Sequence, residues 1–227
     1  MCSHGCVHSW SVVVPAKRLA VAKTRLRPLT SQLPGATESE SVHDELVLAL
    51  LADTVAAAAA CDMVGSVVVV TDDPAAASVA RSFGVPTVPD EPDRGLNPAL
   101  EHGARTSGGS AVAALSSDLP ALRPDELAAA LDAAARTAPR CFVADAQGTG
   151  TTLLTAVGTE LRPRFGPASA AAHVADGAVL LAGGTDAWPG LLRDVDTEED
   201  LRAAAALGVG PRTTAVLERL RTARTRP

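Results

Sequence analysis

The segment WSVVVPAKRLAVAKTRL, residues 10–26, joins a short apolar run to a cationic stretch. Residues 10–14 are rich in β-branched side chains and lack a polar alternation, which is typical of a strand buried on both faces of a parallel sheet. In open α/β sheets, ligands bind beyond the carboxyl ends of such strands. The basic residues that follow the strand therefore occupy an expected ligand position: Lys17, Arg18, Lys23, Arg25 and Arg27.

This stretch is a positive spot on an acidic protein. The chain carries 20 basic and 26 acidic residues, for a net charge of −6, and both of its lysines, Lys17 and Lys23, lie here. The acidic balance argues against a general nucleic-acid binder. Arginine and lysine at a strand end can neutralise the phosphates of a small anion; the alternative is a solvated basic loop.

The turn after the strand contains no glycine, so it matches neither a Walker loop nor a dinucleotide-binding turn. Side-chain charge must then contribute more to anion binding than closely approaching backbone amides do.

Alternating strand and helix patterns extend along the rest of the chain. Their order predicts right-handed βαβ units and an α/β fold: one domain with a mostly parallel twisted sheet flanked by helices, and a small antiparallel extension after about residue 140. The first helix is expected to open with a capping box at Ser41 and Asp44. The predicted strands cover residues 67–70, 111–115, 141–145, 151–157 and 177–181, and the predicted helices cover residues 42–60, 74–83, 98–105, 124–136 and 212–221.

A chain of 227 residues fits a single domain. We place it at residues 10–222, between a flexible tail at 1–9 and a flexible C-terminus at 223–227. The tail holds Cys2, His4, Cys6 and His8 without the paired spacing of a zinc site, so we interpret it as a frayed terminus. With no membrane-length apolar run or signal-like stretch, we expect a cytoplasmic protein without membrane contact. The sequence leaves open whether the protein forms a homo-oligomer.

Three aspartates are candidates for a metal site. Asp118 follows the strand at 111–115, and Asp194 and Asp196 are two apart in an extended segment, so their side chains point to one face. Carboxylates gathered near a polyphosphate repel one another unless a cation lies between them, and Mg²⁺ prefers such oxygen ligands. The alternatives are a turn aspartate and a surface strand end. Thr197 and Asp200 predict the cap of the next helix.

Other polar or unusual residues have structural interpretations. His43, His102 and His173 are scattered and read as surface or packing residues. Cys61 and Cys141 read as small buried hydrophobes. Trp188 is expected to fill a loop core, with the wall of a substrate pocket as the alternative.

Several blocks of the sequence occur in the order of a known family. They are VPAKRLAVAKTRL (14–26), GLNPAL (95–100), SSDLPAL (116–122), FVADAQGTGTTLL (142–154), RFGPASAAAH (164–173) and WPGLLRDVDTEEDL (188–201). Together they resemble the guanylyltransferases of coenzyme F420 biosynthesis, which act on phosphoenolpyruvate or 2-phospho-L-lactate. The likeness runs from about Trp10 to Gly210 and implies the GT-A-like nucleotidyltransferase fold.

The resemblance also implies roles for individual residues. It implies that Asp118, Asp194 and Asp196 bind the metal, and that Thr151, Gly166 and Ser169 hold the carboxylate of the phosphorylated acid. Lys17, Lys23 and Arg25 are the implied catalytic cations. The implied nucleotide-binding residues are Pro15, Ala16, Lys17, Arg18, Lys23 and Asn97. For Asn97, a helix N-cap is an equally good account.

The activity implied is transfer of GMP from GTP to phosphoenolpyruvate, with Mg²⁺ as cofactor, giving enolpyruvyl-diphospho-5'-guanosine and pyrophosphate. The acceptor phosphate is already ionised, so no general base is required, and positioning and charge neutralisation carry the catalysis. Three alternatives stay open: 2-phospho-L-lactate as acceptor, a GT-A glycosyltransferase that uses a nucleotide sugar, and a non-catalytic nucleotide-binding module.

Overall fold

A computed structural model of the chain describes residues 9–16, 23–27, 36–91, 94–183 and 187–224. The interpretations placed on Lys17, Arg18 and the two terminal tails, apart from Ser9 and residues 223–224, lie outside these residues. No helix in the described part of the chain has the length and apolar character needed to cross a membrane.

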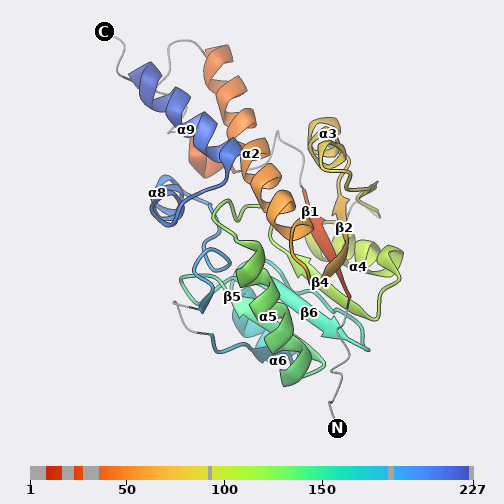
Figure 1. Cartoon of the computed structure of the whole chain (residues 1–227). Coiled ribbons are helices and arrows are strands. Elements are labelled where there is room, and N and C mark those ends of the chain that lie inside the picture. The colour runs from red at the N-terminus through yellow and green to blue at the C-terminus, as the bar shows by residue number, and fades with distance from the viewer. Residues whose placement is uncertain (1–8, 17–22, 28–35, 92–93, 184–186, 225–227) are drawn as a thin grey trace.

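A seven-stranded sheet forms the centre of the molecule, in the order β3-β2-β1-β4-β6-β5-β7 (Figure 1). β6 runs antiparallel to its neighbours β4 and β5, and the other pairings are parallel. The predicted mostly parallel sheet with an antiparallel part is therefore confirmed. The strands are β1 (Trp10–Pro15), β2 (Val64–Val70), β3 (Thr87–Val88), β4 (Ala111–Leu115), β5 (Arg140–Ala144), β6 (Thr151–Val157) and β7 (Val179–Leu180).

The strand β1 is buried on both faces, as its sequence predicts. Val12 and Val14 belong to one apolar cluster with side chains of α2 (Ala36–Ala59), α3 (Pro74–Ser82) and α5 (Pro124–Thr137). Val13 belongs to a second cluster with side chains of α4 (Leu96–Ser107) and α6 (Ser169–Ala175). Helices therefore cover both faces of the sheet (Figure 1).

Small residues let the helices approach the sheet closely in a core with few aromatic rings. On α4, a Cβ added at Gly103 would lie 2.5 Å from a methyl of Val13 and 2.7 Å from one of Val70. These distances are well inside van der Waals contact, so glycine is required where α4 crosses β1 and β2.

A third apolar cluster lies where α2 meets the C-terminal helices α8 (Glu198–Leu207) and α9 (Pro211–Arg224). In Figure 1, α9 runs alongside α2. The buried carboxylate of Asp53 on α2 accepts hydrogen bonds from the backbone N–H of Arg212 (3.1 Å) and Thr213 (2.8 Å). An anion at a helix N-terminus satisfies unpaired amides and the helix dipole, which ties α9 to the domain.

Most element boundaries agree with the sequence predictions to within a few residues. The first helix is the exception, because α2 begins at Ala36 and Ser41 lies inside it, so the predicted capping box at Ser41 and Asp44 is wrong. No proline or glycine occurs between residues 36 and 41, so nothing there stops the helix from starting earlier. The capping box of Thr197 and Asp200 at the start of α8 is confirmed.

Three structural interpretations are also tested. Cys61 and Cys141 are buried and free, as expected. Trp188 packs in the apolar cluster on the α2 side of the sheet, so it fills a core.

Candidate active site

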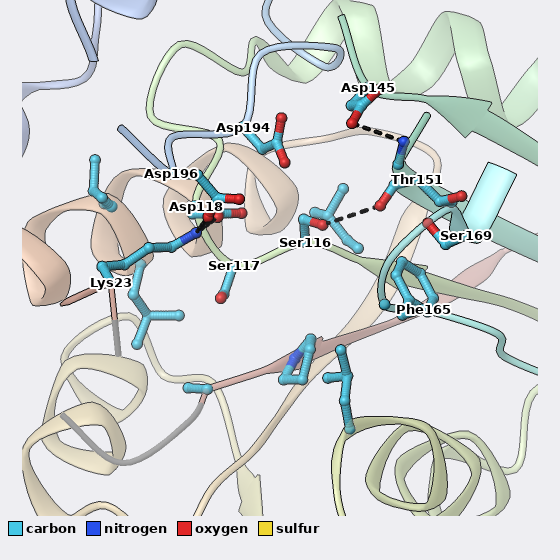
Figure 2. A pocket seen from close by; sticks show the side chains of 18 of the residues that line it. Lys23, Ser116, Ser117, Asp118, Asp145, Thr151, Phe165, Ser169, Asp194 and Asp196 are labelled. Carbon is cyan, nitrogen blue, oxygen red and sulfur yellow. Dashed lines mark hydrogen bonds and ion pairs between the residues drawn. The ribbon is translucent and has the colours of Figure 1, made fainter. Parts of the chain in front are cut away.

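A cavity of about 650 Å³ lies at the edge of the sheet where β1 and β4 end. Because β6 is antiparallel, its first residue, Thr151, reaches this same edge. Polar side chains and backbone from distant parts of the chain meet there: Ala16, Lys23, Arg25, Ser116, Ser117, Asp118, Asp145, Thr149, Gly150, Thr151, Gly166, Ser169, Asp194 and Asp196. Figure 2 shows Lys23, Asp118 and Asp196 together at one end with Asp194 nearby, Thr151, Phe165 and Ser169 at the other end, and Asp145 beside Thr151.

The first end, here called the acidic end, consists of Lys23, Asp118, Asp194 and Asp196. The ammonium of Lys23 forms ion pairs with Asp118 and with Asp196, the latter at 2.5 Å (Figure 2). Lys23 thus bridges two carboxylates that are 78 residues apart in sequence.

Burial and charge at the acidic end together shift two pKa values. Burial alone would lower the pKa of Lys23, but the charges and hydrogen bonds of Asp118 and Asp196 outweigh burial and raise that pKa above its ordinary value. Burial raises the pKa of Asp194 to about 7, and the charges of Asp118 and Asp196 add to the rise. One ammonium therefore does not compensate three closely placed carboxylates.

This arrangement fits a divalent cation in its donor chemistry. Mg²⁺ takes oxygen ligands from one or two carboxylates together with substrate phosphates, and it would supply the missing positive charge. In the part of the chain that the structure describes, the carboxylates are not already spaced as a preformed metal site. The Lys23 ammonium stands between two of them, so metal binding requires it to move.

Backbone contacts hold the aspartates in place. Thr54 of α2 accepts a hydrogen bond from Leu119 N at 2.9 Å through its hydroxyl, which fixes the turn after β4. The carbonyl of Asp118 accepts from Val195 N at 3.1 Å, so the two acidic segments are joined directly. The Asp200 carboxylate accepts from the N–H of Asp196 and of Thr197, which ends the extended segment at the α8 capping box.

The opposite end of the cavity, here called the neutral end, consists of Thr151, Gly166 and Ser169. Thr151 and Ser169 are buried, and Ser169 is the first residue of α6. Ala170 N donates to the carbonyl of Thr149 at 3.1 Å, which ties the start of α6 to the turn before β6. The backbone at Gly166 has a φ of 135°, which few residues other than glycine adopt.

Asp145 shapes the glycine-rich turn between β5 and β6. Its carboxylate accepts hydrogen bonds from the N–H of Thr149 (2.9 Å) and Gly150 (2.8 Å). A Cβ at Gly150 would collide with that carboxylate. The turn therefore needs both the acid and the glycine.

Asn97 lies behind the neutral end and is not part of the cavity wall. Its side-chain amide donates to the carbonyl of Phe165 at 3.0 Å and accepts from Phe165 N at 2.8 Å. The helix N-cap is Gly95, so Asn97 is not the cap that the sequence allows as an alternative. These bonds position the loop that contains Gly166.

His173 of α6 is also behind the neutral end and is fully buried. Its Nδ1 lies 2.9 Å from the hydroxyl of Thr151, and its Nε2 accepts a hydrogen bond from Arg164 N at 2.9 Å. Burial lowers the pKa of His173 to about 4, although Asp176 acts to raise it. The imidazole is therefore neutral at physiological pH.

The sequence prediction places most of its site residues around one cavity. The described residues among them that line it are Pro15, Ala16, Lys23, Arg25, Asp118, Thr151, Gly166, Ser169, Asp194 and Asp196. Whether each binds substrate or metal stays a prediction. Lys17 and Arg18 lie outside the described residues.

Sequence reasoning missed Ser116, Ser117, Asp145 and His173. A usable signal existed for Asp145, because it follows the strand β5 just as Asp118 closely follows β4. His173 was interpreted as a packing or surface residue without a partner. Its burial agrees with packing, but its hydrogen bonds to Thr151 and to Arg164 N are visible only in three dimensions.

Several solved structures with a similar fold are named as nucleotidyltransferases. A nucleotidyl transferase from Methanothermobacter thermautotrophicus superimposes with a TM-score of 0.57 at 19% identity, covering 88% of this chain and 97% of that one. A 4-diphosphocytidyl-2C-methyl-D-erythritol synthase superimposes with a TM-score of 0.56 at 13% identity, covering 88% and 99%. The fold is thus the GT-A-like fold of nucleotidyltransferases.

The sequence relationship is closer and more specific. The family model for CofC-like guanylyl transferases matches residues 10–225, and the chain belongs to this family. It is 69% identical over 211 residues to a phosphoenolpyruvate guanylyltransferase of Geodermatophilus obscurus, covering 93% of this chain and 95% of that protein. It is 55% identical to the protein of the same name in Salinispora arenicola, covering 90% and 91%.

Proposed function

We propose that this protein transfers GMP from GTP to phosphoenolpyruvate, with Mg²⁺ as cofactor. The observation that carries the proposal is one cavity in which Lys23 and Arg25 lie with Asp118, Asp194 and Asp196, opposite a neutral end that contains Thr151 and Ser169. The names of the relatives at 50–69% identity support the same substrates.

The acidic end suits the triphosphate. Lys23 and Arg25 offset negative charge on the β- and γ-phosphates and on the departing pyrophosphate. When bound, Mg²⁺ held by Asp118, Asp194 and Asp196 supplies positive charge between the carboxylates and the phosphates. Lys23 then leaves its ion pairs with Asp118 and Asp196 and turns to the phosphates.

The neutral end suits the carboxylate of the acceptor. The hydroxyls of Thr151 and Ser169 are donors, and Gly166 leaves the backbone accessible. With the carboxylate held there, the acceptor phosphate would lie between the two ends, beside the α-phosphate of GTP.

The reaction needs no general base. An ionised oxygen of the acceptor phosphate attacks the α-phosphorus, the bond from that phosphorus to the β-bridging oxygen breaks, and pyrophosphate leaves in line. The described residues that line the cavity include no histidine or cysteine, which agrees with catalysis by positioning and charge.

A pyrophosphate-release screen tests the proposal. ATP, CTP, GTP and UTP would each be combined with phosphoenolpyruvate, 2-phospho-L-lactate or 3-phosphoglycerate, with and without Mg²⁺. We expect pyrophosphate in the presence of Mg²⁺ from GTP with phosphoenolpyruvate, with the new phosphoanhydride confirmed by ³¹P NMR.

Other outcomes separate the alternatives. Pyrophosphate release only with 2-phospho-L-lactate would change the assigned acceptor to that acid. The two acids are close analogues, which pockets distinguish by only about 1–3 kcal/mol. Tight GTP binding without pyrophosphate from any acceptor would indicate a binding module. Cleavage of a nucleotide sugar would indicate a glycosyltransferase.

A further inference from the structure

The hydrogen bonds of His173 determine where its proton lies. Arg164 N is a backbone amide and can only donate, so the Nε2 atom that it contacts at 2.9 Å must carry a lone pair. A ring protonated at Nε2, whether neutral or cationic, would place two N–H groups against each other. His173 is therefore neutral, with its proton on Nδ1.

This assignment fixes the direction of the second hydrogen bond. Nδ1–H points to the Thr151 hydroxyl at 2.9 Å, so the hydroxyl oxygen accepts there and its own proton must point elsewhere. Within the described part of the chain, Thr151 Oγ1 makes no other hydrogen bond, and Thr151 lines the cavity. The hydroxyl is left as a donor toward the cavity.

The charged groups near His173 do not reverse this arrangement. Asp176 lies at the end of the same helix, but its carboxylate pairs with Arg140 at 2.5 Å and with Arg164 at 3.6 Å. The rings of Phe165 and Phe142 lie 5.3 and 5.6 Å from the imidazole, centroid to centroid, and shield it from solvent. Burial, with the arginine charges, holds the pKa of His173 near 4 despite Asp176.

We propose that His173 is a positioning residue that fixes the Thr151 hydroxyl as a hydrogen-bond donor to an anionic group of the acceptor. The same imidazole holds the loop at Arg164, so one buried ring aligns β6, α6 and the loop between them. The identity of the anion as the carboxylate of a phosphorylated acid rests on the proposed function; the direction of the hydrogen bonds does not.

NMR of the wild-type protein tests the assignment without any substrate. Long-range ¹⁵N–¹H correlation of the histidine rings distinguishes the two neutral tautomers and the imidazolium. We expect His173 to be the Nδ1–H tautomer from pH 5.5 to 8, with its signals assigned by their loss in His173→Asn. An Nε2–H tautomer or an imidazolium at pH 7 would overturn the proposal.

Two substitutions separate the two bonds of the ring. His173→Asn can present a donor near the position of Nδ1 but loses the acceptor for Arg164 N. His173→Gln can present an acceptor near the position of Nε2 but loses the donor toward Thr151. Thermal melting first checks that both variants are folded. We then expect His173→Gln to raise KM for the acceptor about tenfold while KM for GTP is unchanged. The expected increase in His173→Asn is smaller.

Two substitutions of Thr151 form a matched pair, and they test the proposal even if the histidine variants do not fold. Thr151→Val removes the hydroxyl at constant size and should raise the acceptor KM tenfold or more, whereas Thr151→Ser should retain most of the affinity. His173→Gln combined with Thr151→Val should be no worse than Thr151→Val alone, because both act through one hydroxyl. Additive losses, or an equal rise in KM for GTP, would contradict the proposal.

Failure of the proposed function gives a different pattern. If the wild-type protein turns over none of the acids tested while NMR finds the Nδ1–H tautomer, the arrangement of His173 and Thr151 stands and the substrate assignment falls.

Discussion

The two ends of the cavity are built on opposite principles. At the acidic end, burial together with the charges of Asp118 and Asp196 raises the pKa of Asp194 to about 7, although the Lys23 ammonium lies nearby. At the neutral end, uncharged groups are held by hydrogen bonds with Asn97 and His173. Under the proposed function, the first end must change its ion pairs when a ligand enters, whereas the hydrogen bonds of the second end are already made without a ligand.

This contrast indicates how one cavity can handle two anions. A polyphosphate with a divalent cation is strongly charged and can displace Lys23 from Asp118 and Asp196. A small phosphorylated acid offers less binding energy, so its site must be organised beforehand. Substitutions at the acidic end should therefore affect turnover, and those at the neutral end should affect acceptor KM.

The largest effect is expected at Asp118. Asp118→Asn removes one negative charge where the divalent cation is proposed to bind, so turnover should fall about a thousandfold, because charge stabilisation carries the catalysis. Steady-state kinetics at saturating substrates measures this. Asp132→Asn on the exposed side of α5 is the matched control and should retain wild-type rates; equal rates in both variants would exclude Asp118 from the site.

Lys23→Ala should separate metal binding from turnover. Without the ammonium that competes for Asp118 and Asp196, the variant should bind Mn²⁺ more tightly in the absence of nucleotide, as titration calorimetry would measure. Turnover should nevertheless fall about a hundredfold, because the triphosphate loses a cation. Weaker Mn²⁺ binding in Lys23→Ala would contradict the proposed competition.

Asn97→Ala tests whether Asn97 serves the nucleotide or the acceptor. Loss of its two bonds to Phe165 should loosen the loop at Gly166 and raise KM for the acceptor about tenfold, with KM for GTP unchanged. A rise in KM for GTP alone would instead support the nucleotide role that the resemblance implies.

The neutral imidazole of His173 predicts a pH dependence of stability. The folded-state pKa of about 4 lies below the ordinary value of 6.5, so the unfolded chain binds more protons between these values. Stability is retained above pH 6.5 and falls below it, by up to about 1.4 kcal/mol per pH unit from this group. Urea unfolding of the wild type and His173→Asn at pH 7 and 5 measures the difference, which should shrink at pH 5; an unchanged difference would contradict a neutral buried ring.

The smallest effect is expected at the α8 cap. Thr197→Ala removes the hydroxyl that accepts from Asp200 N, which should lower the free energy of unfolding by about 1 kcal/mol. Turnover should stay close to the wild-type value, because the Asp200 carboxylate still holds Asp196 N. A loss of turnover as large as that of Asp118→Asn would mean that the cap itself positions the catalytic groups.

The sequence was informative where charged residues come soon after a predicted strand. The valines of β1 predict a buried strand, and position along a parallel sheet then predicts that Lys23 and Asp118 meet at one edge. The pairing of Lys23 with Asp196 could not be predicted, because it depends on how the α8 segment folds back onto the turn after β4. The start of α2 was missed because local capping signals at Ser41 compete with the helix-compatible residues before it.

The neutral end was predictable only in part. The resemblance supplied Thr151, Gly166 and Ser169, but neither periodicity nor spacing relates His173 to Thr151 or Asn97 to Phe165. These bonds join residues that are 22 and 68 positions apart and depend on the antiparallel course of β6.

The central claim is that the acidic end exchanges an internal ion pair for a metal and a triphosphate. A crystal structure with Mn²⁺ and a non-hydrolysable GTP analogue tests this most directly, because anomalous scattering locates the metal. The account predicts a manganese peak among Asp118, Asp194 and Asp196, with the Lys23 ammonium moved onto the phosphates. A nucleotide bound elsewhere, or Lys23 still paired with Asp118 and Asp196 beside a bound nucleotide, would contradict it.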